Sequence, residues 1–197
     1  MINNIDIIKS IISFDTPDEF YHLQILKRKK EHPSLGSNSY VVKTYYISSM
    51  DYLDKKLPEI IALCDFHNAR AYINLNGRSF ERTAFHTLKK ITDQIMNKDF
   101  KSVRKAYESV CGEFGTGKDK GWIIDIDTPK EELDTDVVVE MLHFLEGIEP
   151  IGNKFICELP TKNGFHLITK PFNVQKFSEK YTAIDVHKNN PTILYIP

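Results

Sequence analysis

Cysteine is scarce in this sequence. Three cysteines, Cys64, Cys111 and Cys157, occur among 197 residues. They lie far apart and form no Cys-x-x-Cys pair, which argues against a zinc finger and against a framework of disulfide bonds. An odd number of dispersed cysteines is typical of a protein in a reducing compartment, so we expect a cytoplasmic location.

Long hydrophobic runs are also lacking. The N-terminal segment MINNIDIIKSIISF is apolar, but Asp6 and Lys9 interrupt it. A membrane-spanning helix needs an uninterrupted apolar stretch, and a signal peptide ends in a cleavage site of small residues. The sequence therefore predicts neither segment, and we expect no membrane among the partners.

A strong charge of either sign is missing. The 26 Lys and Arg residues nearly balance the 27 Asp and Glu residues, which gives a net charge of -1. No overall basic field attracts nucleic acid, so any such binding must come from local patches such as Lys27–Lys30. The hydrophobic fraction of 41% and the charged fraction of 27% are typical of a globular protein.

Hydrophobic periodicity predicts a mixed α/β protein of the α+β class. Helical spacing of apolar residues predicts helices at 2–14, 51–68, 79–96, 99–110, 131–146 and 172–181. Runs of β-branched and aromatic residues predict strands at 40–47, 71–75, 122–127, 154–159, 164–169 and 193–196. The second half has the order β-α-β-β-α-β of a split βαβ or RRM-like sheet. We expect one domain, 1–197, in which an RRM-like unit (119–197) packs against an N-terminal α/β unit (1–118).

Two aspartates interrupt the most hydrophobic predicted strand, in the stretch GWIIDIDTPKEEL. Side chains alternate between the faces of a strand, so Asp125 and Asp127 point the same way. Two adjacent carboxylates repel each other unless a cation lies between them. The pattern indicates a divalent metal site, although an aspartate at a strand end can equally be a turn or helix cap.

Two further segments carry residues suited to chemistry. PTKNGFHLIT is a tight turn that leads into a strand with His166, and AIDVHKNNPTILYI contains Asp185 and Lys188. In a split βαβ sheet the first and third strands are neighbours, so His166 is expected near the aspartate pair. Taken alone, a histidine on a strand is more often structural, and Asp185 more often a surface or cap residue.

Together these segments occur in a family's order. WIIDID, TKNGFHLIT and AIDVHKNNPTILYI resemble the three motifs of the archaeo-eukaryotic primase superfamily, the primase-polymerases that include the small catalytic primase subunit. The resemblance covers about residues 70–197. The second motif departs from the family, in which Ser often precedes x-Gly-x-His or x-His, because this chain has Thr161 and Asn163 there.

The resemblance implies template-directed nucleotidyl transfer. Two Mg²⁺ or Mn²⁺ ions would be held by Asp125, Asp127 and Asp185, the three expected catalytic residues, because these metals prefer carboxylate oxygen. His166 would donate a hydrogen bond to the incoming triphosphate. The implied partners are a single-stranded DNA template, NTPs or dNTPs, and a separate helicase or accessory primase subunit.

Basic and backbone groups near these motifs are candidate nucleotide contacts. The backbone amides of Asn163 and Gly164 are suited to an anion, and Lys162 and Lys188 are suited to the β- and γ-phosphates as point charges. In the family, basic residues of the N-terminal unit face the nucleic acid across the cleft. This favours Arg78 as a template or triphosphate contact.

Other function classes fit the sequence less well. The fragment Gly115-Thr116-Gly117-Lys118 in the glycine-rich stretch 113–121 resembles a phosphate loop, but Asp119 follows the lysine and a strand follows the stretch, which excludes an ATPase. A replication-initiation nicking endonuclease needs two histidines around a bulky residue and a tyrosine nucleophile, and FHLI supplies one histidine. A non-catalytic RRM-like module would bind single strands by stacking on aromatic residues, here Tyr45, Tyr46, Tyr72 and Phe165.

Overall fold

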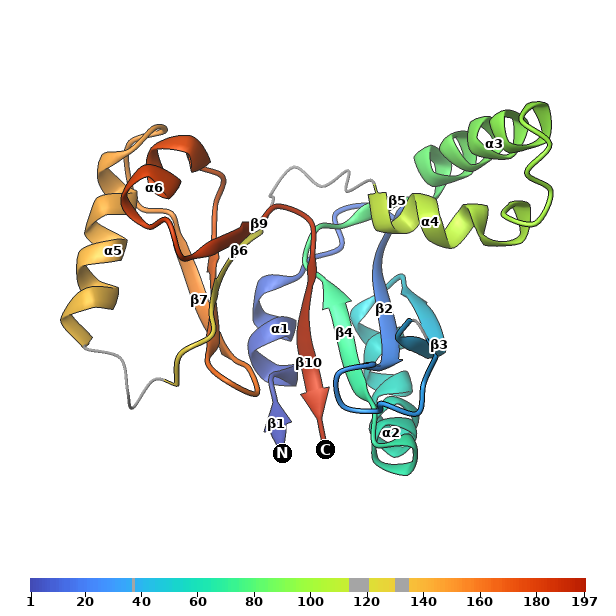
Figure 1. Cartoon of the computed structure of the whole chain (residues 1–197), viewed down its shortest axis with the longest axis horizontal. Coiled ribbons are helices and arrows are strands. Elements are labelled where there is room, and N and C mark those ends of the chain that lie inside the picture. The colour runs from blue at the N-terminus through green and yellow to red at the C-terminus, as the bar shows by residue number, and fades with distance from the viewer. Residues whose placement is uncertain (37, 114–120, 130–134) are drawn as a thin grey trace.

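The chain forms a mixed α/β structure with two antiparallel sheets (Figure 1). The computed structural model describes residues 1–36, 38–113, 121–129 and 135–197. The first sheet has the strand order β1-β10-β4-β2-β3, with β5 paired to β2. Its strands are β1 (Ile2–Asn3), β2 (Glu19–Lys27), β3 (Tyr40–Ile47), β4 (Arg70–Asn74), β5 (Arg78–Ser79) and β10 (Pro191–Ile196).

The second sheet has the strand order β7-β8-β6-β9. Its strands are β6 (Trp122–Ile126), β7 (Phe155–Pro160), β8 (Phe165–Thr169) and β9 (Asp185–His187). Helices α5 (Thr135–Gly147) and α6 (Val174–Lys180) cover its outer face, on the left in Figure 1.

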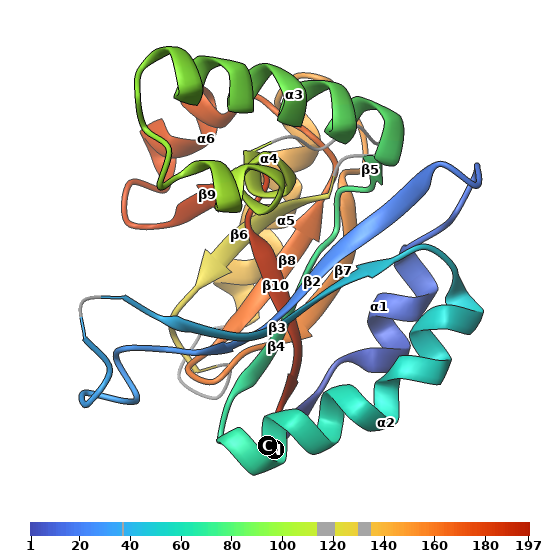
Figure 2. The same ribbon diagram turned by 90° about the vertical axis from the view of Figure 1, so that its right-hand side faces the viewer.

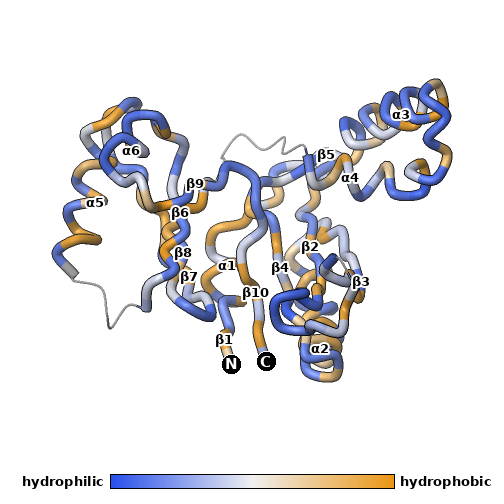
Figure 3. The backbone as a smooth tube through the Cα atoms, viewed as in Figure 1, coloured by the Kyte–Doolittle hydropathy of each residue, from blue (hydrophilic) through white to orange (hydrophobic). Residues whose placement is uncertain are grey.

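The remaining helices are part of the same unit as the first sheet. They are α1 (Ile5–Ile11), α2 (Met50–His67), α3 (Phe80–Met96), the short 3₁₀ helix η1 (Val103–Lys105) and α4 (Ala106–Glu113). In Figure 2, α1 and α2 lie along one side of this sheet, whereas α3 and α4 form a hairpin at its other end. Figure 3 shows apolar residues along the strands that these helices cover.

Successive side chains of β6 point to opposite faces of the second sheet, and each face packs into a different core. Ile124 and Ile126 pack with α5 and α6, whereas Ile123 joins the core that the first sheet forms with α1 and α2. Leu159 and Ile168 of the second sheet join that same core, so the two sheets are packed together. Asp125 and Asp127 share the face of Ile123 and therefore lie on the side of the second sheet that meets the first.

The C-terminal strand corrects the predicted topology. We expected residues 193–196 to complete the RRM-like sheet, but β10 pairs with β1 and β4 of the first sheet. The fourth strand of the second sheet is instead β9, which was not predicted, and β2 was missed as well. The predicted helix 99–110 begins only with η1 and α4. The glycine-rich stretch 114–120 and the expected helix start at 131–134 lie outside the described residues.

Two asparagines hold both places where the chain passes between the sheets. Asn76 Oδ1 accepts a hydrogen bond from the amide of Gly121, just before β6 (2.8 Å), and Asn76 Nδ2 donates to the carbonyl of Lys188, just after β9 (2.9 Å). Asn189 Nδ2 donates to the carbonyl of Gly112 at the end of α4 (3.0 Å). These bonds fix the position of the second sheet against the first.

A buried histidine makes the stability of this fold depend on pH. His22 on β2 is 4% exposed, and desolvation together with the charge of Arg78 lowers its pKa from 6.5 to about 4. Between these values the unfolded chain binds the proton and the folded chain does not, so stability falls as the pH drops through this window. We expect His22 to account for a loss of about 3 kcal/mol of unfolding free energy.

Urea denaturation between pH 6.5 and pH 4 measures this effect. The variant His22→Gln should lack that part of the decline, whereas His143→Gln, whose side chain is 76% exposed, should keep it. The same pH dependence in His22→Gln and in the parent protein would contradict the assignment.

Candidate active site

The pairing register brings four of the predicted residues to one face of the second sheet. On β6, Asp125 lies opposite His166 of β8 and opposite Asp185 of β9. Directly opposed residues of antiparallel strands point to the same face. Asp127, two residues beyond Asp125, shares that face. Three acids and a histidine from three distant segments therefore lie side by side.

A pocket of about 480 Å³ lies between this face and the first sheet. The second sheet contributes its acidic and imidazole side chains to one wall, and the first sheet contributes basic side chains to the other. The residues around it include Asp125, Asp127, His166 and His187 on one wall, Arg28, Lys30, Arg70 and Tyr72 on the other, and Thr161, Lys162 and Asn163 of the β7–β8 turn.

Asp125 is the most constrained of the acids. It is half-buried, and its carboxylate lies 3.3 Å from Nε2 of His166 and 3.7 Å from Nε2 of His187. The hydrogen bond from His166 is the main reason that the pKa of Asp125 is held below its ordinary value, and the charges of His187 and Arg28 act in the same direction. Asp125 is therefore an ionised carboxylate at neutral pH.

His166 is held from both sides of its ring. Its Nδ1 is hydrogen-bonded to the hydroxyl of Thr192 on β10 at 2.8 Å, while Nε2 faces Asp125. Thr192 is fully buried. The first sheet thus orients a side chain of the second sheet at the pocket.

Asp127 and Asp185 are more accessible. Both are exposed, and together with Asp125 they line a second cavity of about 330 Å³ next to the start of β9. Asp185 belongs to this smaller cavity and not to the lining of the larger pocket. Asp125 and Asp127, which we call the DxD pair, thus line both spaces, whereas Asp185 lies at the edge of the sheet.

The β7–β8 turn is pressed against the end of β6. A Cβ atom on Gly164 would lie 1.9 Å from the carbonyl oxygen of Ile126 and 2.9 Å from that of Thr128, so no other residue fits. This contact brings Lys162 and Asn163 to the pocket, next to the DxD pair. The glycine of the second motif is therefore explained by close packing of two backbones.

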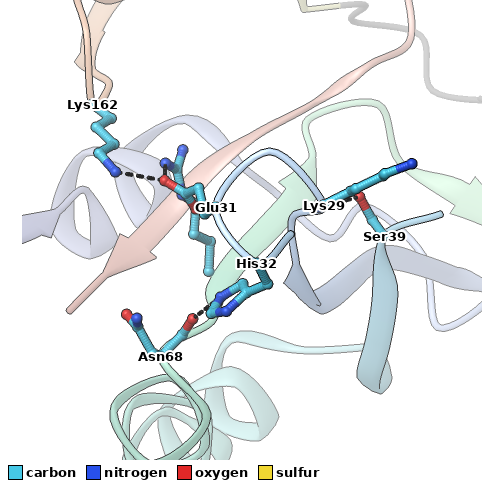
Figure 4. Close-up of polar contacts among 7 residues, drawn as sticks. Lys29, Glu31, His32, Ser39, Asn68 and Lys162 are labelled. Carbon is cyan, nitrogen blue, oxygen red and sulfur yellow. Dashed lines mark hydrogen bonds and ion pairs between the residues drawn. The ribbon is translucent and has the colours of Figure 1, made fainter. Parts of the chain in front are cut away.

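Lys162 reaches across to the N-terminal unit. Its Nζ lies 2.6 Å from the carboxylate of Glu31, which also pairs with Arg70 (Figure 4). Next to Glu31, His32 contacts the carbonyl of Asn68 at 2.9 Å. The ion pair between Lys162 and Glu31 joins the two units at this end of the pocket.

Lys188 does not line the larger pocket. Its Nζ lies 4.9 Å from the ring centroid of Trp122, a residue packed against the α5–α6 side of the second sheet. The predicted phosphate contact would require this side chain to leave the indole ring.

Arg78 also lies outside the site. Its side chain is fully buried, and its guanidinium donates to the carbonyls of Cys111 and Asn76 and lies 3.4 Å from Oδ1 of Asn189. Desolvation lowers its pKa to about 10. We predicted a contact with template or triphosphate, but this position assigns Arg78 to the junction between the units.

Arg78→Met should therefore destabilise the fold without a specific effect on substrate binding. Removing a buried guanidinium leaves its carbonyl partners unsatisfied, and we expect the unfolding free energy to fall by about 2–4 kcal/mol. Chemical denaturation measures this change, and Arg82→Met, at an exposed position in the first turn of α3, is the control. Unchanged stability combined with a raised KM for nucleotides would restore the original assignment.

Sequence reasoning missed three residues of the site. His187 lies two positions after Asp185 on β9, so strand alternation alone places it on the same face. Arg28 was recognised only as part of a peripheral basic cluster. Thr192 carried no signal, because its partner His166 belongs to the other sheet.

The donor set at the DxD pair suits a hard divalent cation, since its oxygens come from carboxylates. Among the described residues, no three His, Cys, Asp or Glu side chains already form a complete cluster around one point. Asp125 and Asp127 would hold such an ion with water or phosphate oxygens in the remaining positions, as Mg²⁺ commonly requires.

No protein-family model, curated protein or solved structure matches this chain. Within the described part of the chain, no helix has both the length and the apolar character that are needed to cross a membrane. Function has to be inferred from the geometry of the pocket itself.

Proposed function

We propose that this chain is the catalytic core of a primase-polymerase, a template-directed nucleotidyltransferase that makes or extends a nucleic-acid strand from nucleoside triphosphates. One observation carries the proposal. Asp125, Asp127, His166 and Asp185, which come from three separate motifs, share one face of a sheet beside a pocket with a basic opposite wall.

The fold of the second unit supports the same proposal. Its elements run β6-α5-β7-β8-α6-β9, with β6 and β8 as the two central strands. With β9 as the fourth strand, this order agrees with the one expected for an RRM-like split βαβ sheet, which supports the proposal. The resemblance to the archaeo-eukaryotic primase superfamily implies such a unit packed against an N-terminal α/β unit.

Asp125, Asp127 and Asp185 would hold the divalent ions. When bound, Mg²⁺ or Mn²⁺ ions stabilise the charge that develops on the attacking and leaving oxygens of a phosphoryl transfer. Ionised Asp125 is suited to this task because His166 and His187 keep its pKa low. Asp127 and Asp185 are accessible to the same space next to β9.

The other side chains of the pocket are suited to the triphosphate. His166 presents Nε2 to the acidic face while Thr192 holds its Nδ1, so the imidazole is already oriented as a hydrogen-bond donor. Arg28 and Lys30 line the opposite wall and would neutralise phosphate charge. Lys162 would exchange its ion pair with Glu31 for a phosphate oxygen.

Incubation with a single-stranded template tests the proposal. Primed and unprimed templates are supplied with labelled NTPs or dNTPs, and the products are separated by length with Mg²⁺, with Mn²⁺ and with a chelator. We expect template-dependent products that require the metal. Products that form equally well in the chelator, or no product with any template and metal, would reject the assignment.

The arrangement of the pocket gives little support to the two alternatives, a nicking endonuclease and a non-catalytic module that binds single strands by stacking. A nicking endonuclease would find a second histidine in His187, but the hydroxyl of Tyr72, the tyrosine among the described residues of the pocket, is buried. A stacking module would use Tyr45, Tyr46, Tyr72 and Phe165. Tyr45 and Phe165 are 3% and 2% exposed and belong to the cores, and Tyr46 packs against the rings of Phe20 and Tyr107. Neither arrangement offers an accessible tyrosine nucleophile or stacking platform at these positions.

A further inference from the structure

Helix α3 has the reverse polarity of an ordinary surface helix: its covered side is mostly polar and its exposed side is mostly apolar. Its sheltered side, against α4, carries Thr83, Thr87, Lys90, Ile91 and Gln94, most of which are polar. Surface helices normally direct their apolar stripe inward and their polar face to water. In α3 the outward face holds the apolar residues instead.

The outward face carries an apolar stripe that Thr92 interrupts. Phe85 and Leu88 lie before Thr92, and Ile95 and Met96 follow it on the same face of the helix, with exposed fractions of 66%, 64%, 49% and 76%. Phe100, just beyond the helix, is 65% exposed. The hairpin stands at the outer edge of the molecule (Figures 1 and 3), so the described part of the chain leaves this stripe uncovered. Such a concentration of exposed apolar side chains marks an interaction surface.

The stripe is complementary to itself in the antiparallel direction. With a two-fold axis crossing the helix between Lys90 and Ile91, Phe85 of one copy lies opposite Met96 of the second. Because such an axis pairs each flank of the helix with the same flank of its partner, Lys89 of one copy approaches Asp93 of the other, twice per dimer. Neither side chain makes an ion pair within the described residues.

Charge favours a second copy over other partners. The exposed charges of α3 balance, with Glu81 and Asp93 against Arg82 and Lys89, so the helix has no net attraction for an anionic lipid surface. A second copy supplies a lysine to each Asp93. The paired stripe of large apolar side chains corresponds to an interface near the lower end of the stable range, about 1,200 Å² in total.

We infer that α3 is the interface of a symmetric, antiparallel homodimer of this chain. The inference does not depend on the proposed enzymatic function, because α3 contributes no residue to the pocket at the DxD pair. The two active-site pockets of such a dimer would remain accessible, since the hairpin lies at the far end of the first sheet (Figure 2).

Sedimentation velocity of the full chain over a wide concentration range tests the inference. The parent protein should associate reversibly to a dimer. Lys89→Glu and Asp93→Lys should each raise the dissociation constant at least about tenfold, because each places like charges together at both ends of the interface. Lys55→Glu, at an exposed position on α2, is the matched control and should leave the dimer unchanged.

Mixing the two charge variants distinguishes this arrangement from any other. In a heterodimer of Lys89→Glu with Asp93→Lys, every cross-pair is again attractive, so the mixture should dimerise more tightly than either variant alone. A parent protein that remains monomeric at every concentration would overturn the inference and leave the stripe to lipid or to another protein. A mixture no more associated than its components would overturn the antiparallel register.

Discussion

Replacing both Asp125 and Asp127 with asparagine should lower the rate of nucleotide incorporation at least about a thousandfold. Asparagine keeps the shape of the side chain and can still accept the hydrogen bond from His166, but it removes the two charges that would hold the metal. A thousandfold loss corresponds to about 4 kcal/mol of transition-state stabilisation, which is a reasonable share for metal-ion catalysis. Single-turnover incorporation on a primed template measures the effect.

Two controls make this experiment specific. Asp6→Asn changes an exposed aspartate of α1 and should have no effect on incorporation. Circular dichroism of the double variant should match the parent, and its unfolding temperature should fall only slightly, because neither carboxylate is part of a core and the lost interaction of Asp125 with His166 is partly exposed to solvent. Incorporation that persists in Asp125→Asn/Asp127→Asn would remove the basis of the proposed function.

Gly164→Ala should cause the largest loss of stability among single substitutions at the site. The added methyl group would lie 1.9 Å from the carbonyl oxygen of Ile126, and both partners are backbone, so the clash cannot be relieved by a side-chain rotation. We expect the unfolding free energy to fall by at least about 3 kcal/mol. The turn that carries Lys162 and Asn163 would be displaced from the DxD pair, so incorporation should fall as well.

Denaturation by urea, followed by tryptophan fluorescence, measures the stability term. Gly147→Ala in α5 is the matched control, since a Cβ there meets nothing within 4 Å and alanine favours a helix. That variant should be as stable as the parent or slightly more stable. If Gly164→Ala matched Gly147→Ala in stability, the close approach of the turn to β6 would be wrong.

Much of the candidate site could be predicted because it depends on local periodicity. Alternation along one strand places Asp125 and Asp127 on the same face, whatever the rest of the chain does. The order of elements around them predicted that the strand with His166 would be a neighbour. The register, Asp125 opposite both His166 and Asp185, agrees with that expectation.

Other residues could not be placed by local reasoning. Arg78 follows a strand and a glycine, a pattern that looks like an exposed turn, yet α4 covers it and Cys111 accepts its hydrogen bond. Lys188 is close in sequence to Asp185, but its side chain lies over Trp122 on the other side of the sheet. In both cases the partner is distant in the sequence, and no periodic pattern encodes it.

The sequence by itself determined the type of most elements and the face on which the acid pair lies, because both follow from the spacing of apolar and charged residues along a single segment. Only the tertiary structure decided that β10 leaves the second unit for the first sheet, that His187 and Thr192 join the site, and that Arg78 is buried. Strand pairing and burial are contacts between residues far apart in the chain, and their free energy depends on which surfaces meet when the two sheets pack together.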